Sequence, residues 1–183
     1  MKDKNIKKQI NTAKDCAFLA TFVAVVVAIQ LGLSFVPGVE LVTVLFVSFS
    51  FVMGLKRGML AATVFSVIRQ LVFGFYPVVL ILYLVYFNML TALLGFLGKK
   101  LSGGFKYLII VTLIACLCTV LFSMFDNVLT PLWYGYSKKA MRLYFYGSLP
   151  FMFVQVISVG VSVFALFLPL KKVFLTVKEK IYS

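Results

Sequence analysis

The chain has 183 residues, of which 63% are hydrophobic and only 13% are charged, and its mean hydropathy is +1.09. A soluble domain is typically about half apolar and a quarter charged, and a domain of this length could not bury so much apolar surface. The composition therefore excludes an ordinary soluble protein and predicts an all-α integral membrane protein that crosses the bilayer several times.

The charge balance has two interpretations. The 18 Lys and Arg residues outnumber the 5 Asp and Glu residues, which gives a formal net charge of +13. In a soluble protein this excess would indicate nucleic-acid binding. In a membrane protein it must first be compared with the topology, because cytoplasmic loops collect basic residues.

Two features of the composition restrict the chemistry. The chain has no histidine, so the usual general base and the commonest metal ligand are absent. The three cysteines, Cys16, Cys116 and Cys118, lie in apolar runs, and an odd number argues against a disulfide framework. Cys116 and Cys118 are two apart and point to different sides of a helix, so they cannot hold one metal. We expect no catalytic site, metal site or cofactor.

The first long apolar run, 12–36, predicts a helix that ends before Pro37. It follows the basic segment 1–14. A cleaved signal peptide is the alternative interpretation, but the run exceeds the usual apolar length of 7–15 residues and no small-residue cleavage site precedes Pro37. We therefore expect an uncleaved first span.

Five further runs follow. The second, 39–55, and the third, 59–75, are short for a bilayer that needs about 20 residues, so we expect them to be tilted, partly embedded or shielded by neighbours. The other three runs are 78–97, 107–125 and 148–174.

Segment 126–147 is polar and aromatic. It predicts either a long non-cytoplasmic connection or an extension of the fifth helix followed by a loop. No internal repeat is visible, so an inverted-repeat transporter gains no support. We expect one membrane domain, 1–183, with a basic cytoplasmic N-terminus (1–11) and a basic cytoplasmic tail (175–183).

The basic residues fit one orientation of six spans. If the N-terminus is cytoplasmic, 14 of the 18 Lys and Arg residues fall on the cytoplasmic side: those in segments 1–14, 54–58 and 98–106, and Lys171, Lys172, Lys178 and Lys180 at the C-terminal end. The reverse orientation would oppose the strong preference of basic loops for the cytoplasm. The sequence thus predicts a compact bundle of six transmembrane helices with both termini cytoplasmic, and nucleic acid is not an expected partner.

Polar side chains in membrane helices are costly and often functional. They concentrate toward the predicted outer half, which suggests an outward-facing pocket. Arg69 could instead reach the interface or form a structural bridge with Glu40, amides could join helices, and the aromatic residues could form an interfacial belt. The candidate substrate-binding residues are Gln30, Glu40, Arg69, Gln70, Asn88, Asp126, Asn127, Trp133, Tyr136 and Gln155.

The first predicted helix has a stripe of small residues, Ala20, Ala24 and Ala28, preceded by Ala13 and Ala17. Alanines four apart lie on one helix face and let another helix approach closely. The stripe predicts either packing inside the bundle or docking of a partner.

The chain resembles the substrate-binding S components of energy-coupling factor (ECF) transporters over nearly its whole length. The likeness includes its size, six spans with short second and third helices, and the alanine stripe. Local segments are also similar: 37–42 (PGVELV), 51–58 (FVMGLKRG), 125–130 (FDNVLT) and 148–151 (SLPF).

The resemblance implies a vitamin-capturing subunit in a prokaryotic plasma membrane. Such a subunit binds its ligand in an outward pocket, joins a transmembrane coupling subunit and two cytoplasmic ATPases, and topples to release the ligand inside. Ala20, Ala24 and Ala28 match the face that docks the coupling subunit. The chain has no phosphate-binding loop of the Gly-x-x-x-x-Gly-Lys-Ser/Thr type, so ATP hydrolysis would come from the partners.

Three other functions remain open. A stand-alone permease or channel would use the same polar residues without ATPase partners. A membrane enzyme could use Glu40, Asp126 and Arg69 as acid–base groups, although no nucleophile lies beside a base, and a structural anchor would not need polar groups at one depth. The ligand is also open among cobalamin, queuosine precursors, riboflavin, thiamine and folate.

Overall fold

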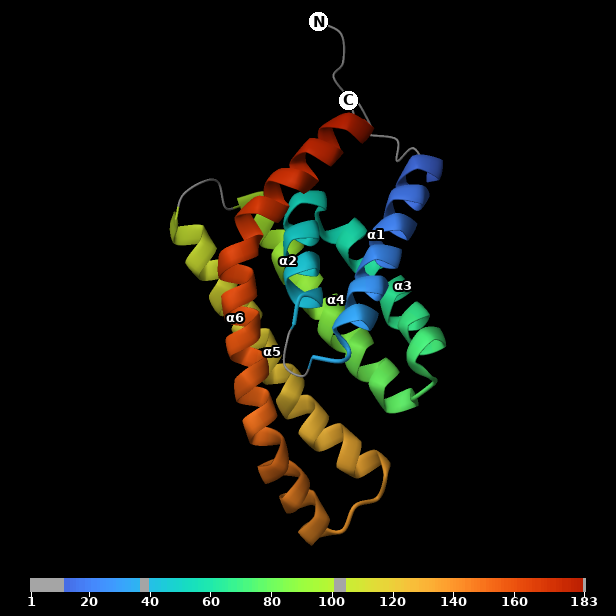
Figure 1. Ribbon diagram of the computed structural model, residues 1–183, viewed down its shortest axis with the longest axis vertical. Helices are drawn as coiled ribbons and strands as arrows, with labels where there is room; N and C mark the ends of the chain where they lie inside the picture. Colours follow the sequence, from blue (N-terminus) through green and yellow to red (C-terminus); the bar gives the residue numbers. More distant parts are fainter. Residues whose placement is uncertain (1–11, 37–39, 101–104, 183) are drawn as a thin grey trace, which may run out of the picture.

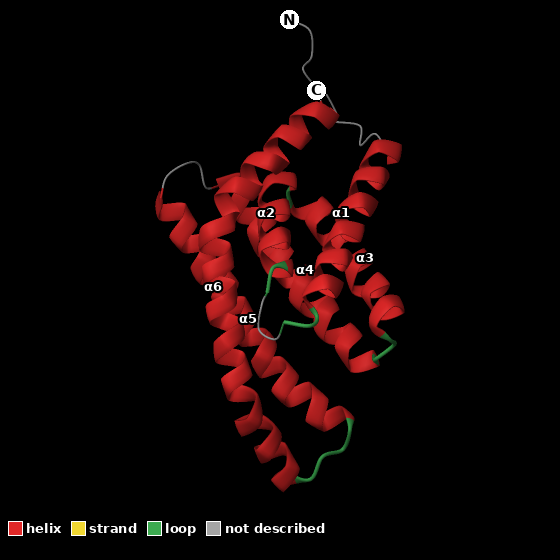
Figure 2. Cartoon of the chain, in the orientation of Figure 1, coloured by secondary structure: helices red, strands yellow, loops and turns green. Residues whose placement is uncertain are grey.

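A computed structural model describes residues 12–36, 40–100 and 105–182, and these ranges contain α-helices and no strand. The all-helical prediction is confirmed, and the predicted basic segment 1–11 lies outside the described residues. The start of α1 and the end of α6 lie at the same end of the bundle (Figures 1 and 2). The helices are α1 (Thr12–Leu33), α2 (Val42–Met53), α3 (Leu55–Phe73), α4 (Pro77–Lys100), α5 (Phe105–Trp133) and α6 (Lys138–Tyr182).

The surface of the bundle is apolar. Four helical segments are long and apolar enough to cross a membrane: Ala13–Leu33, Pro77–Lys99, Tyr107–Trp133 and Lys138–Ile181. Among the described residues, large apolar side chains are exposed on every helix except α2. This outward-facing apolar surface is compatible with a membrane protein and would be unfavourable in water.

Helix α2 forms the centre of the bundle. Its 12 residues would extend about 18 Å at the α-helical rise, which is less than the hydrocarbon thickness of about 30 Å. It contacts all five other helices (Figure 1). Phe46 and Phe49 are fully buried, and Phe22 of α1 stacks on Phe49 with ring centroids 4.0 Å apart. The short second run was expected to be tilted, partly embedded or shielded by its neighbours, and the structure shows that its neighbours shield it.

Gly54 alone connects α2 to α3. Its φ of +86° is accessible to glycine but strained for residues with a Cβ atom. Helix α3 therefore begins at Leu55 and places Lys56 and Arg57 in its first turn. The predicted start of the third helix at Met59 is wrong, because the sharp turn needs one residue rather than a loop.

The predicted long connection over 126–147 is wrong, whereas the extension of the fifth helix is correct. Helix α5 continues to Trp133 and α6 begins at Lys138, so these helices form a hairpin that extends beyond the others (Figure 1). Hydrogen bonds to Asp126 show how this hairpin accommodates a polar side chain. The Asp126 carboxylate accepts hydrogen bonds from Thr130 (2.5 Å) and from Tyr144 of α6 (3.0 Å). The predicted tail is also helical to Tyr182.

An ion pair that the sequence did not indicate joins α1 to α3. The Asp15 carboxylate, which is 4% exposed, accepts hydrogen bonds from Nε and Nη2 of Arg57 at 3.0 and 3.2 Å. Paired N–H groups of arginine match the two oxygens of a carboxylate. The pair therefore fixes the start of α3 against the start of α1.

We expect Arg57→Met to destabilise the protein by about 3 kcal/mol, because it leaves the buried Asp15 carboxylate without this partner. Lys56→Met is the matched control, since it removes the same charge from an exposed neighbour. Thermal unfolding in detergent measures both variants. Equal melting temperatures would show that the ion pair does not stabilise the bundle.

Candidate functional site

A polar layer crosses the bundle, and its first part surrounds Tyr83 of α4. Gln30 of α1 donates a hydrogen bond from Nε2 to the Tyr83 hydroxyl, at 3.1 Å. The guanidinium carbon of Arg69, on α3, lies 4.1 Å from the centroid of the Tyr83 ring and 4.9 Å from that of Phe73. Cations are attracted to the faces of aromatic rings, so Tyr83 positions both the amide and the cation.

The second part of the layer begins at Glu40, in the connection before α2. Its carboxylate accepts a hydrogen bond from the Thr43 hydroxyl at 3.1 Å. The Thr43 hydroxyl is 3.1 Å from that of Tyr86, which is 3.1 Å from that of Thr119. This chain of hydroxyl groups links the carboxylate to α2, α4 and α5.

Glu40 also joins the layer to α6. Its backbone N–H donates a hydrogen bond to the Ser158 hydroxyl at 2.9 Å, and the Gln155 side chain interacts with its carboxylate. Arg69 attracts the same carboxylate electrostatically. All six helices contribute to the polar layer, which we define as Gln30, Glu40, Thr43, Arg69, Tyr83, Tyr86, Thr119, Gln155 and Ser158.

Two polar atoms of the layer are left without hydrogen bonds. Oε1 of Gln30 and Nε of Arg69 are buried and have no partner among the described residues. The direct ion pair between Arg69 and Glu40, one of the predicted alternatives, is not present within the described part of the chain. An unsatisfied buried polar atom costs about 1–3 kcal/mol. The layer would therefore gain free energy by hydrogen-bonding to a polar solute.

The structure thus brings together four of the predicted site residues: Gln30, Glu40, Arg69 and Gln155. Two others hold helices in place instead. The Gln70 side chain accepts a hydrogen bond from the backbone N–H of Tyr76 at 3.1 Å, in the α3–α4 turn. Asn88 accepts a hydrogen bond from Thr63 of α3 at 3.2 Å, as the interhelical interpretation predicts.

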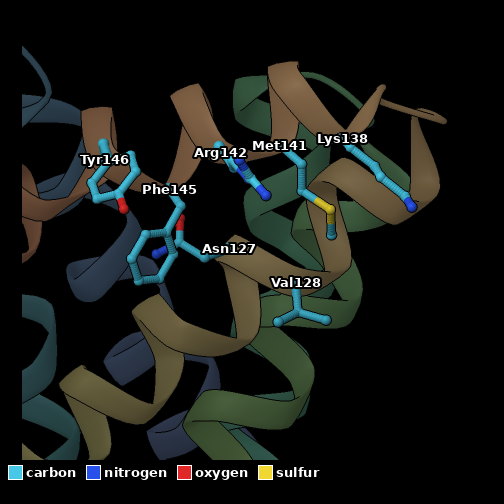
Figure 3. A pocket seen from close by; sticks show the side chains of 7 residues that line it. All are labelled: Asn127, Val128, Lys138, Met141, Arg142, Phe145 and Tyr146. Carbon is cyan, nitrogen blue, oxygen red and sulfur yellow. The ribbon is translucent and has the colours of Figure 1, made fainter.

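The remaining predicted residues lie on the α5–α6 hairpin. Ser158 and Tyr144 are fourteen residues apart on α6, or about 21 Å along a straight helix. Asp126 bonds to Tyr144, and Asn127 lines a groove of about 560 Å³ between the two helices (Figure 3). Trp133 and Tyr136 are exposed near the hairpin turn. The predicted residues therefore form two groups at different levels.

Five residues of the layer were not predicted from the sequence: Thr43, Tyr83, Tyr86, Thr119 and Ser158. Single hydroxyl groups are common in apolar helices, because a hydroxyl can bond to the carbonyl one turn earlier. The spacing of Tyr83 and Tyr86 was the available signal, since residues three apart share a helix face.

The alanine stripe lies on the outer surface of α1. Ala20, Ala24 and Ala28 are all exposed, as are Ala13 and Ala17. Of the two predicted interpretations, packing inside this bundle is therefore wrong. The stripe leaves a shallow surface that a helix from outside the chain could approach closely.

Comparisons with known proteins identify no relative of this chain. No family model matches it, and neither a curated protein nor a solved structure matches it significantly.

Proposed function

We propose that this chain is a substrate-capturing membrane subunit of the ECF S-component type, with the polar layer as its binding site. The proposal rests mainly on the polar layer, which places a cation, a carboxylate and two amides inside an apolar bundle. Two buried polar atoms of this layer have no hydrogen-bond partner within the described ranges. Ionisable groups at this depth are expensive and are retained mainly for function.

The proposed membrane position follows from α6. Its apolar stretch from Ser148 to Leu170 ends at Lys171 and Lys172, and these 23 residues extend about 34 Å, close to the hydrocarbon thickness. Ser158 then lies near mid-depth. At this level the backbone N–H of Glu40, which is half-buried, donates a hydrogen bond to the Ser158 hydroxyl, so this donor of the non-helical connection is satisfied.

Six spans with both termini cytoplasmic are part of this proposal. The end of the bundle that holds the start of α1 also holds the start of α3 and the end of α6 (Figure 1). It therefore gathers Lys56, Arg57, Lys171 and Lys172, a distribution that favours a cytoplasmic position. Helix α2, which begins near mid-depth and is only about 18 Å long, would lie inside the bundle and reach one side of the membrane without contacting lipid.

The proposed ligand is a water-soluble vitamin or related micronutrient. The Arg69 guanidinium and the Gln30 amide, which hold the two unpartnered buried atoms, would hydrogen-bond to the polar groups of such a ligand. The proposed partners are a transmembrane coupling subunit, which would dock on the alanine stripe, and two cytoplasmic ATPases. The membrane would be the plasma membrane of a prokaryotic cell.

A thermal-shift screen against a panel of vitamins and their precursors tests the proposal. A ligand that binds only the native state raises the melting temperature. Arg69→Gln is expected to weaken binding about 10- to 100-fold, because it removes a hydrogen-bonding charge. Lys139→Gln, an exposed site on the hairpin, is the control and should bind normally.

Two outcomes would contradict the proposal. If no compound of the panel shifts the melting temperature or binds by calorimetry, the capture function fails. If the purified chain alone moves the ligand into liposomes, the stand-alone permease is correct and the ATPase partners are unnecessary.

A further inference from the structure

The groove of the α5–α6 hairpin is a second candidate site, distinct from the polar layer. Its volume is about 560 Å³. Helix α5 contributes Asn127 and Val128, and Figure 3 shows the other lining side chains extending from α6 across the same groove. These α6 residues are Lys138, Met141, Arg142, Phe145 and Tyr146.

Asn127 points to a polar ligand in this groove. Its side chain is 4% exposed, yet neither its amide oxygen nor its amide nitrogen has a hydrogen-bond partner among the described residues. A buried amide is usually fully hydrogen-bonded. A ligand with both acceptor and donor groups would satisfy it.

The charge of the groove selects an anion. Lys138 and Arg142 are exposed cations at its edge, and neither forms an ion pair within the described part of the chain. Val128 and Phe145 add an apolar wall and are 53% and 37% exposed. The groove thus combines anion recognition with an apolar surface, which suits an amphiphile better than a small soluble ion.

The depth of the groove matches lipid headgroups. In the membrane position proposed above, the hydrocarbon ends near Ser148. Phe145 lies three residues beyond it, or about 4.5 Å along the helix, and Arg142 lies about 9 Å beyond it, from where its long side chain can reach back toward the phosphates. The headgroup layer is roughly 5–8 Å thick on each side. Trp133, Tyr134 and Tyr146 are exposed on the same hairpin, as expected for an aromatic belt at the interface.

We propose that this groove binds the headgroup of an anionic phospholipid. Arg142 and Lys138 would bind the phosphate, the Asn127 amide would hydrogen-bond to the headgroup, and an acyl chain would lie along Val128 and Phe145. The inference depends on the proposed membrane position but not on the vitamin ligand.

Native mass spectrometry of the full chain with phosphatidylglycerol tests the site, with phosphatidylcholine as the zwitterionic comparison. The double variant Lys138→Gln/Arg142→Gln is expected to lose at least about tenfold in phosphatidylglycerol affinity, because each cation near an anionic headgroup contributes roughly fivefold. Asn127→Leu should also weaken binding. Lys139→Gln is the control, since this exposed cation does not line the groove and should keep the lipid.

Three results would overturn the proposal: equal binding of the two lipids, equal loss in the Lys139 control, or equally tight binding of inorganic phosphate. The last would mean that the groove takes a soluble anion. Vitamin binding by the double variant separates the two proposals, because Arg69 and the rest of the polar layer are unchanged in it.

Discussion

Gly98→Ala is expected to lower the free energy of unfolding by roughly 3 kcal/mol, because the bundle has no room for one more carbon at this position. A Cβ atom built on Gly98 would lie 2.2 Å from the backbone oxygen of Phe51. One turn earlier, a Cβ on Gly95 would lie 2.6 Å from the Cα of Leu55. These two glycines let α4 pass directly against the α2–α3 junction, as small residues do between membrane helices.

The control for Gly98 is Gly147→Ala, which is also in a helix. Nothing lies within 4 Å of a Cβ built on Gly147, so alanine should stabilise this helix by up to about 1 kcal/mol. Thermal or denaturant unfolding in detergent compares the two variants. If both melt at the same temperature, α4 does not pack this closely against α2 and α3.

Ala24→Trp is expected to reduce partner-dependent uptake by roughly 10- to 100-fold, the effect of forcing bulk into a close-packed helix interface. Ala24 is exposed, so the isolated chain can accommodate the indole and should bind ligand normally. Transport in cells that contain the proposed coupling subunit and ATPases measures the first quantity, and calorimetry with the purified chain measures the second.

Leu117→Trp is the matched control for Ala24, because Leu117 is a 60% exposed apolar residue of α5. It should preserve uptake if the alanine stripe is the docking surface. Unchanged uptake in Ala24→Trp would exclude docking at this stripe. Loss of ligand binding together with uptake would mean that the stripe supports the fold of the chain itself.

The sequence predicted the helices better than their ends. Apolar runs identified all six, since few polar residues interrupt them. The predicted bounds were wrong at two places, one where a single residue turns the chain and one where a tertiary contact keeps an expected loop helical. Gly54 reverses the chain in a single residue, and the Tyr144–Asp126 hydrogen bond lets a polar segment remain helical.

The candidate site shows the same division. The cost of burying Arg69, Glu40, Gln30 and Gln155 in an apolar chain made these residues visible in the sequence. The predicted depth in the membrane did not distinguish these four residues from Asn127. Residues predicted near the same interface can lie far apart, because α5 and α6 extend beyond the other helices. The Ser, Thr and Tyr hydroxyl groups that connect the layer were not predicted from the sequence, because single hydroxyl groups are common in apolar helices.

Composition and hydropathy by themselves determined that this chain is a helical protein with an apolar exterior, because these properties sum over residues and do not depend on their arrangement. Only the tertiary structure decided which polar groups meet. It placed Tyr83 between Gln30 and Arg69, joined Glu40 to α6, and left the alanine stripe on the surface. Such contacts join residues distant in the chain, and their partners are set by how the helices pack around α2.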